Sequence, residues 1–161
     1  IQTAAAAGLV PVGDFRLNVC NRHTAEVYRK MGVSDLILSP ELTLPMIRDI
    51  GGGTLVYGRV PLMITERCFA RENGGCRRCG HVSLVDRIGK KFPILREYPH
   101  RSLILNAVPT YMGDRADDLG RYGVSWEHFL FTTESPAEVR DVVRAWKCGR
   151  PLSAEVRRVG K

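Results

Sequence analysis

Three of the chain's five cysteines lie close together, at positions 68, 76 and 79. Cys76 and Cys79 form a Cys-x-x-Cys pair, whose thiolates can both face one centre from a tight turn. The two glycines before Cys76 give the backbone freedom to wrap around that centre. The spacing favours a metal ion or an iron–sulfur cluster bound by Cys68, Cys76 and Cys79. A set of free thiols or a redox pair is the alternative.

Tetrahedral zinc or an iron–sulfur cluster usually needs a fourth protein ligand. We expect His100 to supply it, because this histidine lies in a polar, basic stretch, REYPHRS. Cys148, at the end of a predicted helix, is the next candidate. His81 stands only two residues after Cys79, where it would crowd the centre, and Cys20 ends an apolar stretch that suits the core.

Positive charge is concentrated around the same cysteines. The formal net charge is +7, and residues 67–101 contribute +6 of it, with nine Lys and Arg against three acids. Such a patch attracts phosphates, so we expect RNA or an anionic small molecule as a partner, with a solvated basic face as the alternative. The candidate anion-binding residues are Arg67, Arg71, Arg77, Arg78, Lys90, Lys91 and Arg101.

Composition sets the broad class. With 161 residues, 44% of them apolar and 25% charged, the chain suits one globular domain and not a disordered segment. No run approaches the roughly 18 apolar residues of a membrane span. The opening IQTAAAAGLV lacks the basic start and long apolar centre of a secretory signal. We therefore expect a cytoplasmic protein without membrane contact, in a reducing compartment that disfavours disulfides.

Strands and helices alternate on both sides of the cysteine region. Apolar stretches at 9–12, 15–19, 34–39, 54–65 and 126–133 suit strands, and residues 22–32 have helical spacing up to Gly32. A second helix is expected to begin at Pro40, with Ser39 as its cap. A third helix begins at Pro136, where Ser135 and Glu138 form a capping box. Its expected buried stripe is Val139, Val142, Val143 and Trp146.

This alternation predicts an α/β fold with a parallel sheet. About four strand–helix units are present, whereas a closed eight-unit barrel usually takes about 250 residues. We therefore expect residues 1–149 to be the C-terminal half of a TIM-like barrel, inactive alone and self-associating through unpaired strand edges. A Cys-rich insertion at about 65–101 should contain a β-hairpin, with strands at 82–86 and 92–95. The basic tail, residues 150–161, is expected to fray.

Catalytic side chains are harder to select. Glu66, Asp86 and Glu134 lie near predicted strand ends and could act as acid, base or partner to an arginine, although a salt-bridged scaffold carboxylate is the favoured interpretation of each. Tyr57 and Tyr111 could line a site or pack in the core. The sequence contains no His-Glu-x-x-His, Gly-x-Ser-x-Gly or Walker motif, so the corresponding metalloprotease, serine-hydrolase and nucleotide-binding mechanisms are not indicated.

Five ordered motifs resemble a known family. YGRVPLMITERC, GGCRRCG, LVDRIGKKFPILRE, RSLILNAVPTYMGDRADDL and FLFTTESPAEV occur in the order typical of U32 peptidases, the collagenase-like protease family. The resemblance covers roughly residues 8–146 and is strongest to the C-terminal part of the family's catalytic domain, a TIM-like barrel.

The resemblance implies two kinds of activity. The family name implies hydrolysis of peptide bonds. Other branches are similar to oxygen-independent hydroxylases of RNA bases or of the ubiquinone ring, which use a cysteine-bound [4Fe–4S] cluster and prephenate as oxygen donor. In this chain Cys68, Cys76 and Cys79 match the cluster-binding cysteines. Many relatives have a further cysteine downstream, where His100 stands here, which leaves open a histidine-ligated cluster, a zinc site or a lost cluster.

Three functions follow as expectations. The first is an iron–sulfur enzyme that hydroxylates RNA or a small aromatic substrate. The second is a peptidase acting on a collagen-like peptide. The third is a non-enzymatic, zinc-stabilised RNA-binding module.

Overall fold

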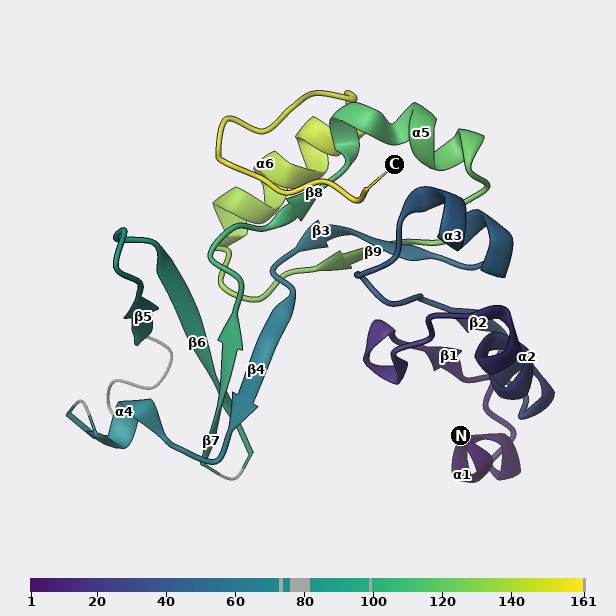
Figure 1. Ribbon diagram of the computed structural model, residues 1–161, viewed down its shortest axis with the longest axis horizontal. Coiled ribbons are helices and arrows are strands. Elements are labelled where there is room, and N and C mark those ends of the chain that lie inside the picture. The colour runs from purple at the N-terminus through teal and green to yellow at the C-terminus, as the bar shows by residue number, and fades with distance from the viewer. Residues whose placement is uncertain (73, 76–81, 99, 161) are drawn as a thin grey trace.

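The computed structural model describes residues 1–72, 74–75, 82–98 and 100–160, which form a mixed α/β structure with three sheets (Figure 1). The α/β class is therefore confirmed. None of these sheets closes into a barrel within the described residues. In the same part of the chain, every helix is too short or too polar to cross a lipid bilayer.

Four short strands run parallel to one another. They are β1 (Val12–Gly13), β2 (Asp35–Leu36), β3 (Thr54–Gly58) and β9 (Glu127–Leu130). β1 pairs with β2, and β3 pairs with β9. A parallel bridge between Ile37 and Gly53 joins the end of β2 to the start of β3. The order of neighbours is thus β1, β2, β3 and β9.

Helices occupy the connections between these strands. The α-helices outside the cysteine region are α1 (Gln2–Ala6), α2 (Arg22–Lys30), α3 (Leu44–Ile50), α5 (Ala116–Arg121) and α6 (Pro136–Lys147). α2 links β1 to β2, α3 links β2 to β3, α5 precedes β9, and α6 follows it. The described residues also include the 3-10 turns η1 (Phe15–Leu17) and η3 (Gly113–Arg115). This is the strand–helix alternation that the sequence predicts.

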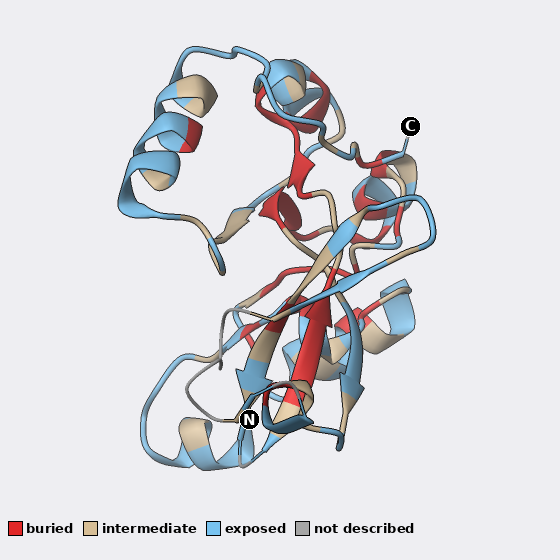
Figure 2. Ribbon diagram, turned by 90° about the vertical axis from the view of Figure 1, so that its left-hand side faces the viewer, coloured by how far each residue is buried: buried red, intermediate tan, exposed pale blue. Residues whose placement is uncertain are grey.

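The core forms around β3, in which all five residues are buried. Val56 on this strand packs with apolar side chains from α2, α3 and α5, and the buried segments stand out in Figure 2. A smaller cluster on the other side joins Tyr57, Tyr111 and Val142, with Trp146 packed edge-on against Tyr111. Burial of this kind contributes about 25 cal/mol per Å² of apolar surface.

An arm of four antiparallel strands extends from the end of β3. The arm, residues 61–105, consists of β4 (Pro61–Thr65), β5 (Ser83–Val85), β6 (Lys91–Glu97), β7 (Arg101–Leu105) and the single turn α4 (Phe69–Glu72). Its strand order is β4-β7-β6-β5, and α4 lies at the end remote from β3 (Figure 1). β5 and β6 pair as the predicted hairpin, which is confirmed. The chain then returns through β8 (Thr110–Tyr111), antiparallel to β3.

The local predictions hold where capping residues mark a helix. α2 begins after Asn21, whose side chain accepts a hydrogen bond from Thr24 N, and α6 begins with the full capping box of Ser135 and Glu138. The stripe on α6 is narrower than predicted, because only Val142 is fully buried and Val143 is exposed.

Two predicted elements are wrong. The helix expected at Pro40 begins at Leu44, because Ser39–Leu42 form a turn closed by a bond from Leu42 N to Ser39 O, and Thr43 becomes the cap residue. The second apolar stretch, at 15–19, forms η1 instead of a strand. Asp14 accepts a hydrogen bond from Phe15 N, and Asn18 ends the turn with a left-handed φ of 50°.

The basic tail does not fray, contrary to prediction. Arg157 N donates to Pro109 O at 2.8 Å, and Tyr111 N donates to Arg157 O at 3.0 Å, so the tail pairs with the β8 segment. Arg158 forms an ion pair with Asp114 at 2.6 Å. Val159 is 7% exposed and belongs to the main core. The tail stays in place because it supplies a core side chain, which composition alone does not reveal.

Val159→Ala should therefore lower the free energy of unfolding by about 1–2 kcal/mol, from the two buried methyl groups that it removes. Urea denaturation measures the effect. Val10→Ala is the matched control, since Val10 is 73% exposed. Equal stability of the two variants would contradict docking of the tail.

Candidate functional site

Cys68 lies at the far end of the arm, directly before α4. The turn that carries it is fixed by backbone donors: Arg67 N donates to Thr65 Oγ1 at 3.1 Å, and Phe69 N donates to Ser102 Oγ at 3.3 Å. Since Ser102 is a buried residue of β7, the cysteine is tied to the sheet of the arm.

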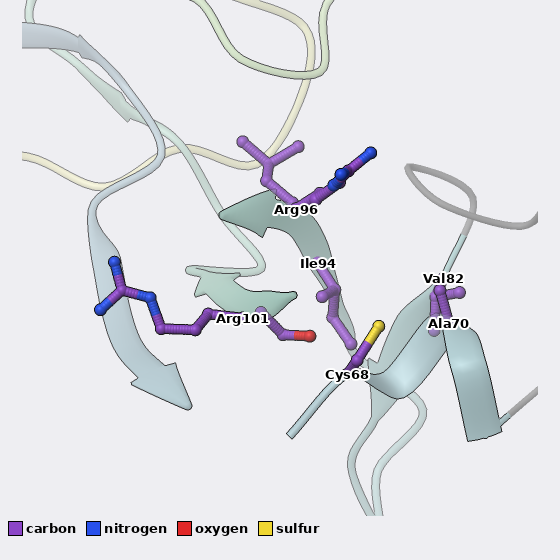
Figure 3. Close-up of a pocket in the computed structure, with 8 residues that line it drawn as sticks. Cys68, Ala70, Val82, Ile94, Arg96 and Arg101 are labelled. Atoms are coloured by element: carbon purple, nitrogen blue, oxygen red, sulfur yellow. The ribbon is translucent and has the colours of Figure 1, made fainter. Parts of the chain in front are cut away.

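The Cys68 thiol faces a small pocket of about 10 Å³ (Figure 3). Ala70, Val82 and Ile94 form apolar walls near the sulfur. Arg96 and Arg101 also line the pocket, but their guanidinium groups extend away from the sulfur. In this arrangement these two arginines therefore do not directly stabilise a Cys68 thiolate.

Cys76 and Cys79 lie outside the described residues, as do Arg77, Arg78 and His81. The described residues on either side of this segment are anchored beside Cys68. Gly75 N donates to Ala70 O at 2.9 Å, and Ile94 N donates to Val82 O at 3.1 Å. Ala70, Val82 and Ile94 all line the Cys68 pocket. Both flanks of the segment that carries the other two thiols therefore adjoin the pocket that Cys68 faces.

The candidate fourth ligands lie in different places. His100 is exposed in the turn before β7. Ser102 near the start of β7 pairs with Thr65 at the end of β4, so His100 and Cys68 both lie at the same end of the arm. Cys148 caps the end of α6, which lies across the molecule from α4 in Figure 1. Cys20 packs against the main core, as its apolar setting predicts. Within the described residues, no three His, Cys, Asp or Glu side chains form a group that could hold a metal ion.

The basic residues of the arm are partly neutralised. Arg67 pairs with Glu72 at 2.6 Å, and Lys90 pairs with Glu155 of the tail at 2.8 Å. Arg101 lies 3.7 Å from Glu66. By contrast, four exposed cations of the arm have no acidic partner among the described residues; they are Arg71, Arg87, Lys91 and Arg96.

Two of the three predicted carboxylates have clear scaffold contacts. Glu66 is highly exposed beside Arg101. Asp86 accepts hydrogen bonds from Ile88 N and Lys90 N, both at 2.9 Å, which closes the turn between β5 and β6. In neither contact does the carboxylate face a group with which it could exchange a proton as a general acid or base.

Glu134 is different, because it lies in a cleft beside the end of β3. Its Oε1 accepts a hydrogen bond from the hydroxyl of Tyr57 at 3.1 Å. Its Oε2 accepts from Thr132 N at 2.7 Å and from Thr133 N at 3.0 Å. Three donors thus fix the carboxylate at the carboxyl ends of the parallel strands β3 and β9, which is where ligands bind in α/β folds.

The Tyr57 hydroxyl is held in its neutral, donating form. The ring is 4% exposed, and burial raises the pKa of this phenol well above its usual value, with the charge and hydrogen bond of Glu134 adding to the effect. Arg59, two residues further on, donates through Nη1 to the carbonyl oxygens of Asn106 and Ala107. The sequence indicated Tyr57 and Glu134 separately; nothing local showed that they meet.

Tyr57→Phe should lower the free energy of unfolding by about 2 kcal/mol near neutral pH, because it removes a hydrogen bond to a charged group. A phenol pKa that is higher in the folded state than its ordinary value of 10.0 stabilises the protein below pH 10, and this stabilisation is lost as the pH rises towards the folded pKa. The decline in stability above pH 10 should therefore be shallower in the variant.

Chemical denaturation at a series of pH values measures both effects. Part of the decline should persist, because burial also raises the pKa of Tyr111. Tyr98→Phe is the control, since Tyr98 is 83% exposed. A decline as steep in Tyr57→Phe as in the parent would contradict this role for Tyr57.

In comparisons with protein-family models, with curated proteins and with solved structures, no match to the chain was found. The likeness to U32 peptidases accordingly remains a prediction from the five sequence motifs.

Proposed function

We propose that the chain is part of a U32-type barrel enzyme whose arm holds a sulfur-ligated metal centre, and that it hydroxylates RNA or a small aromatic molecule. The single observation that carries the proposal is the position of the Cys68 thiol, which faces a pocket bordered by both flanks of the segment bearing Cys76 and Cys79. Cys76 follows the anchored Gly75 directly in the sequence, and Cys79 precedes Val82 by three residues.

The arrangement of parallel strands supports the barrel part of this proposal. β1, β2, β3 and β9 are consecutive neighbours with helices in their connections, as in successive units of a TIM-like barrel. The arm begins directly after β3, at the carboxyl end of this strand, which is the end where barrels carry their active sites. β1 has exposed apolar residues at and before it, Leu9, Val10 and Val12, as expected of an edge that another strand would cover.

The described residues suit a thiolate-bound centre only in part, since Cys68 alone of the three thiols is among them. Cys68, Cys76 and Cys79 would hold the centre, with His100 as the proposed fourth ligand. An iron–sulfur cluster bound there would supply one-electron redox chemistry. The chain's own contribution is to fix Cys68 through the hydrogen bonds of its turn and to surround it with apolar walls that restrict water.

Peptidase activity is the second candidate, and the cleft beside Glu134 favours it. A carboxylate held by three donors, next to a protonated phenol, is an arrangement that can orient water or a peptide group. The third candidate, a zinc-stabilised RNA-binding module, is favoured by the unpaired cations of the arm.

Metal analysis tests the first proposal. Protein purified without oxygen should be brown and contain iron and acid-labile sulfide. Cys76→Ser should lose the metal, because it removes one of three thiolate ligands, whereas Cys148→Ser, at the end of α6, should retain it. Elemental analysis and visible absorption measure both variants.

The alternatives give different results in the same experiment. A colourless preparation without iron would contradict the iron–sulfur proposal, and stoichiometric zinc without sulfide would favour the binding module. Cleavage of a gelatin peptide that survives Cys76→Ser would support a peptidase that uses the cleft instead of the thiols.

Self-association through strand edges is also expected. β4 is an edge strand of the arm, and Leu62, Met63 and Ile64 are exposed in succession on it. Sedimentation velocity at rising concentration should show dimers or larger species, and Met63→Lys should reduce them, because a charge on an edge strand disfavours pairing. Val27→Lys, on the exposed face of α2, is the control. A monomer at all concentrations would contradict the expectation.

A further inference from the structure

We infer that the cleft beside Tyr57 and Glu134 binds the basic side chain of a peptide, either lysine or arginine. The cleft has a volume of about 470 Å³. The end of β3, the segment before β8, the start of α6 and the tail form its walls. This binding site is separate from the proposed sulfur centre, and the inference does not depend on any metal.

The charge of the cleft selects a cation. Four of its lining residues are acidic and one is basic; the acids are Glu134, Glu138, Asp141 and Glu155. The basic residue, Arg59, has its Nη1 donating to two backbone carbonyls. Glu155 is paired with Lys90, and Asp141 lies 3.6 Å from the exposed Arg144. Neither Glu134 nor Glu138 forms an ion pair among the described residues, although the charge of Arg59 acts on Glu138 from within the same cleft.

Both of these carboxylates are already oriented. Glu134 is fixed by the Tyr57 hydroxyl and two backbone N–H groups, which use three of the roughly four lone-pair positions of a carboxylate. Glu138 accepts a hydrogen bond from Ser135 N at 2.7 Å, which lowers the pKa of its carboxyl and keeps it ionised. An ammonium or guanidinium group entering the cleft would meet acceptors that need little further ordering.

The remaining walls suit the aliphatic part of such a side chain. Apolar residues from three segments line the cleft; they are Ala107, Val108, Pro109, Val142, Leu152 and Ala154. Lysine and arginine bury their methylene stems against apolar surface while the charged end stays with polar partners. A small inorganic cation would leave these walls unused.

A separate observation points to a peptide in preference to a simple amine. Nε of Arg59 is buried and has no hydrogen-bond acceptor among the described residues, although Arg59 lines the cleft. A buried donor without an acceptor is costly. Because this atom is itself buried, Arg59 has to shift before a carbonyl oxygen brought by a ligand can accept from it. A peptide supplies both groups, a carbonyl for Arg59 and a basic end for the carboxylates. The same carboxylates would repel nucleic-acid phosphates.

Titration of the ¹⁵N-labelled chain with two capped tripeptides tests this inference. Acetyl-Gly-Lys-Gly-amide carries the ammonium group, and acetyl-Gly-norleucine-Gly-amide has the same stem without it. The lysine peptide should shift the amide signals of Thr132 and Thr133, which donate to Glu134, and should bind at least about fivefold more tightly than the norleucine peptide.

A double variant, Glu138→Gln with Asp141→Asn, should weaken binding of the lysine peptide about three- to tenfold. Glutamine at position 138 preserves the capping box of α6, so the variant should stay folded, which the same spectra verify. Glu26→Gln, on exposed α2 outside the cleft, is the matched control and should bind like the parent.

Three results with the lysine and norleucine peptides would overturn the inference. They are equal affinity for the lysine and norleucine peptides, no shift at Thr132 and Thr133 at millimolar peptide, and equal weakening by Glu26→Gln and the double variant. Replacing lysine by arginine in the peptide should leave binding intact, whereas an acidic peptide that binds as well would also contradict it.

Discussion

Close contact between β3 and β9 is the constraint on which the rest of the structure depends. A Cβ atom at Gly53 would collide with Trp126, and one at Gly58 would collide with Leu130, so glycine is required at both ends of β3. Gly58 also has a φ of 137°, which other residues rarely adopt. The chain can leave β3 there and enter the arm while β9 stays paired. That pairing brings Glu134, just beyond β9, to the hydroxyl of Tyr57.

The molecule separates its charges between two places. The basic segment, residues 67–101, falls almost entirely on the arm, whereas acids gather at the cleft beside β3. We propose that an anion binds at the arm and a cation at the cleft, and the two places meet at the ion pair between Lys90 and Glu155. The net charge of +7 therefore does not imply that the whole surface binds RNA.

Local sequence patterns predicted most of the elements, but not the contacts between distant segments. The capping box at Ser135 and the alternating strands around Gly89 depend on neighbouring residues, so α6 and the β5–β6 hairpin were predictable. The hydrogen bond from Tyr57 to Glu134 joins residues 77 positions apart, and no periodicity records it. Val159 is likewise one of four apolar residues scattered in a basic tail, and only its three-dimensional neighbours make it part of the main core. For the sulfur site, the sequence supplies the spacing of the three cysteines and the structure supplies the position of Cys68, because Cys76 and Cys79 lie outside the described residues.

The tail connects the two places physically. Leu152 and Glu155 line the cleft, and Glu155 also pairs with Lys90 in the turn at the end of the β5–β6 hairpin. The tail is held on both sides of this stretch, since Tyr111 donates its hydroxyl proton to Arg150 O and Arg157 pairs with the β8 segment. An exposed ion pair is worth less than about 1 kcal/mol by itself. Between two anchored ends, however, the stretch has little freedom, so displacement of the arm near Lys90 would act on the wall of the cleft. The tail therefore connects the arm to the wall of the cleft, although the two places carry opposite charges.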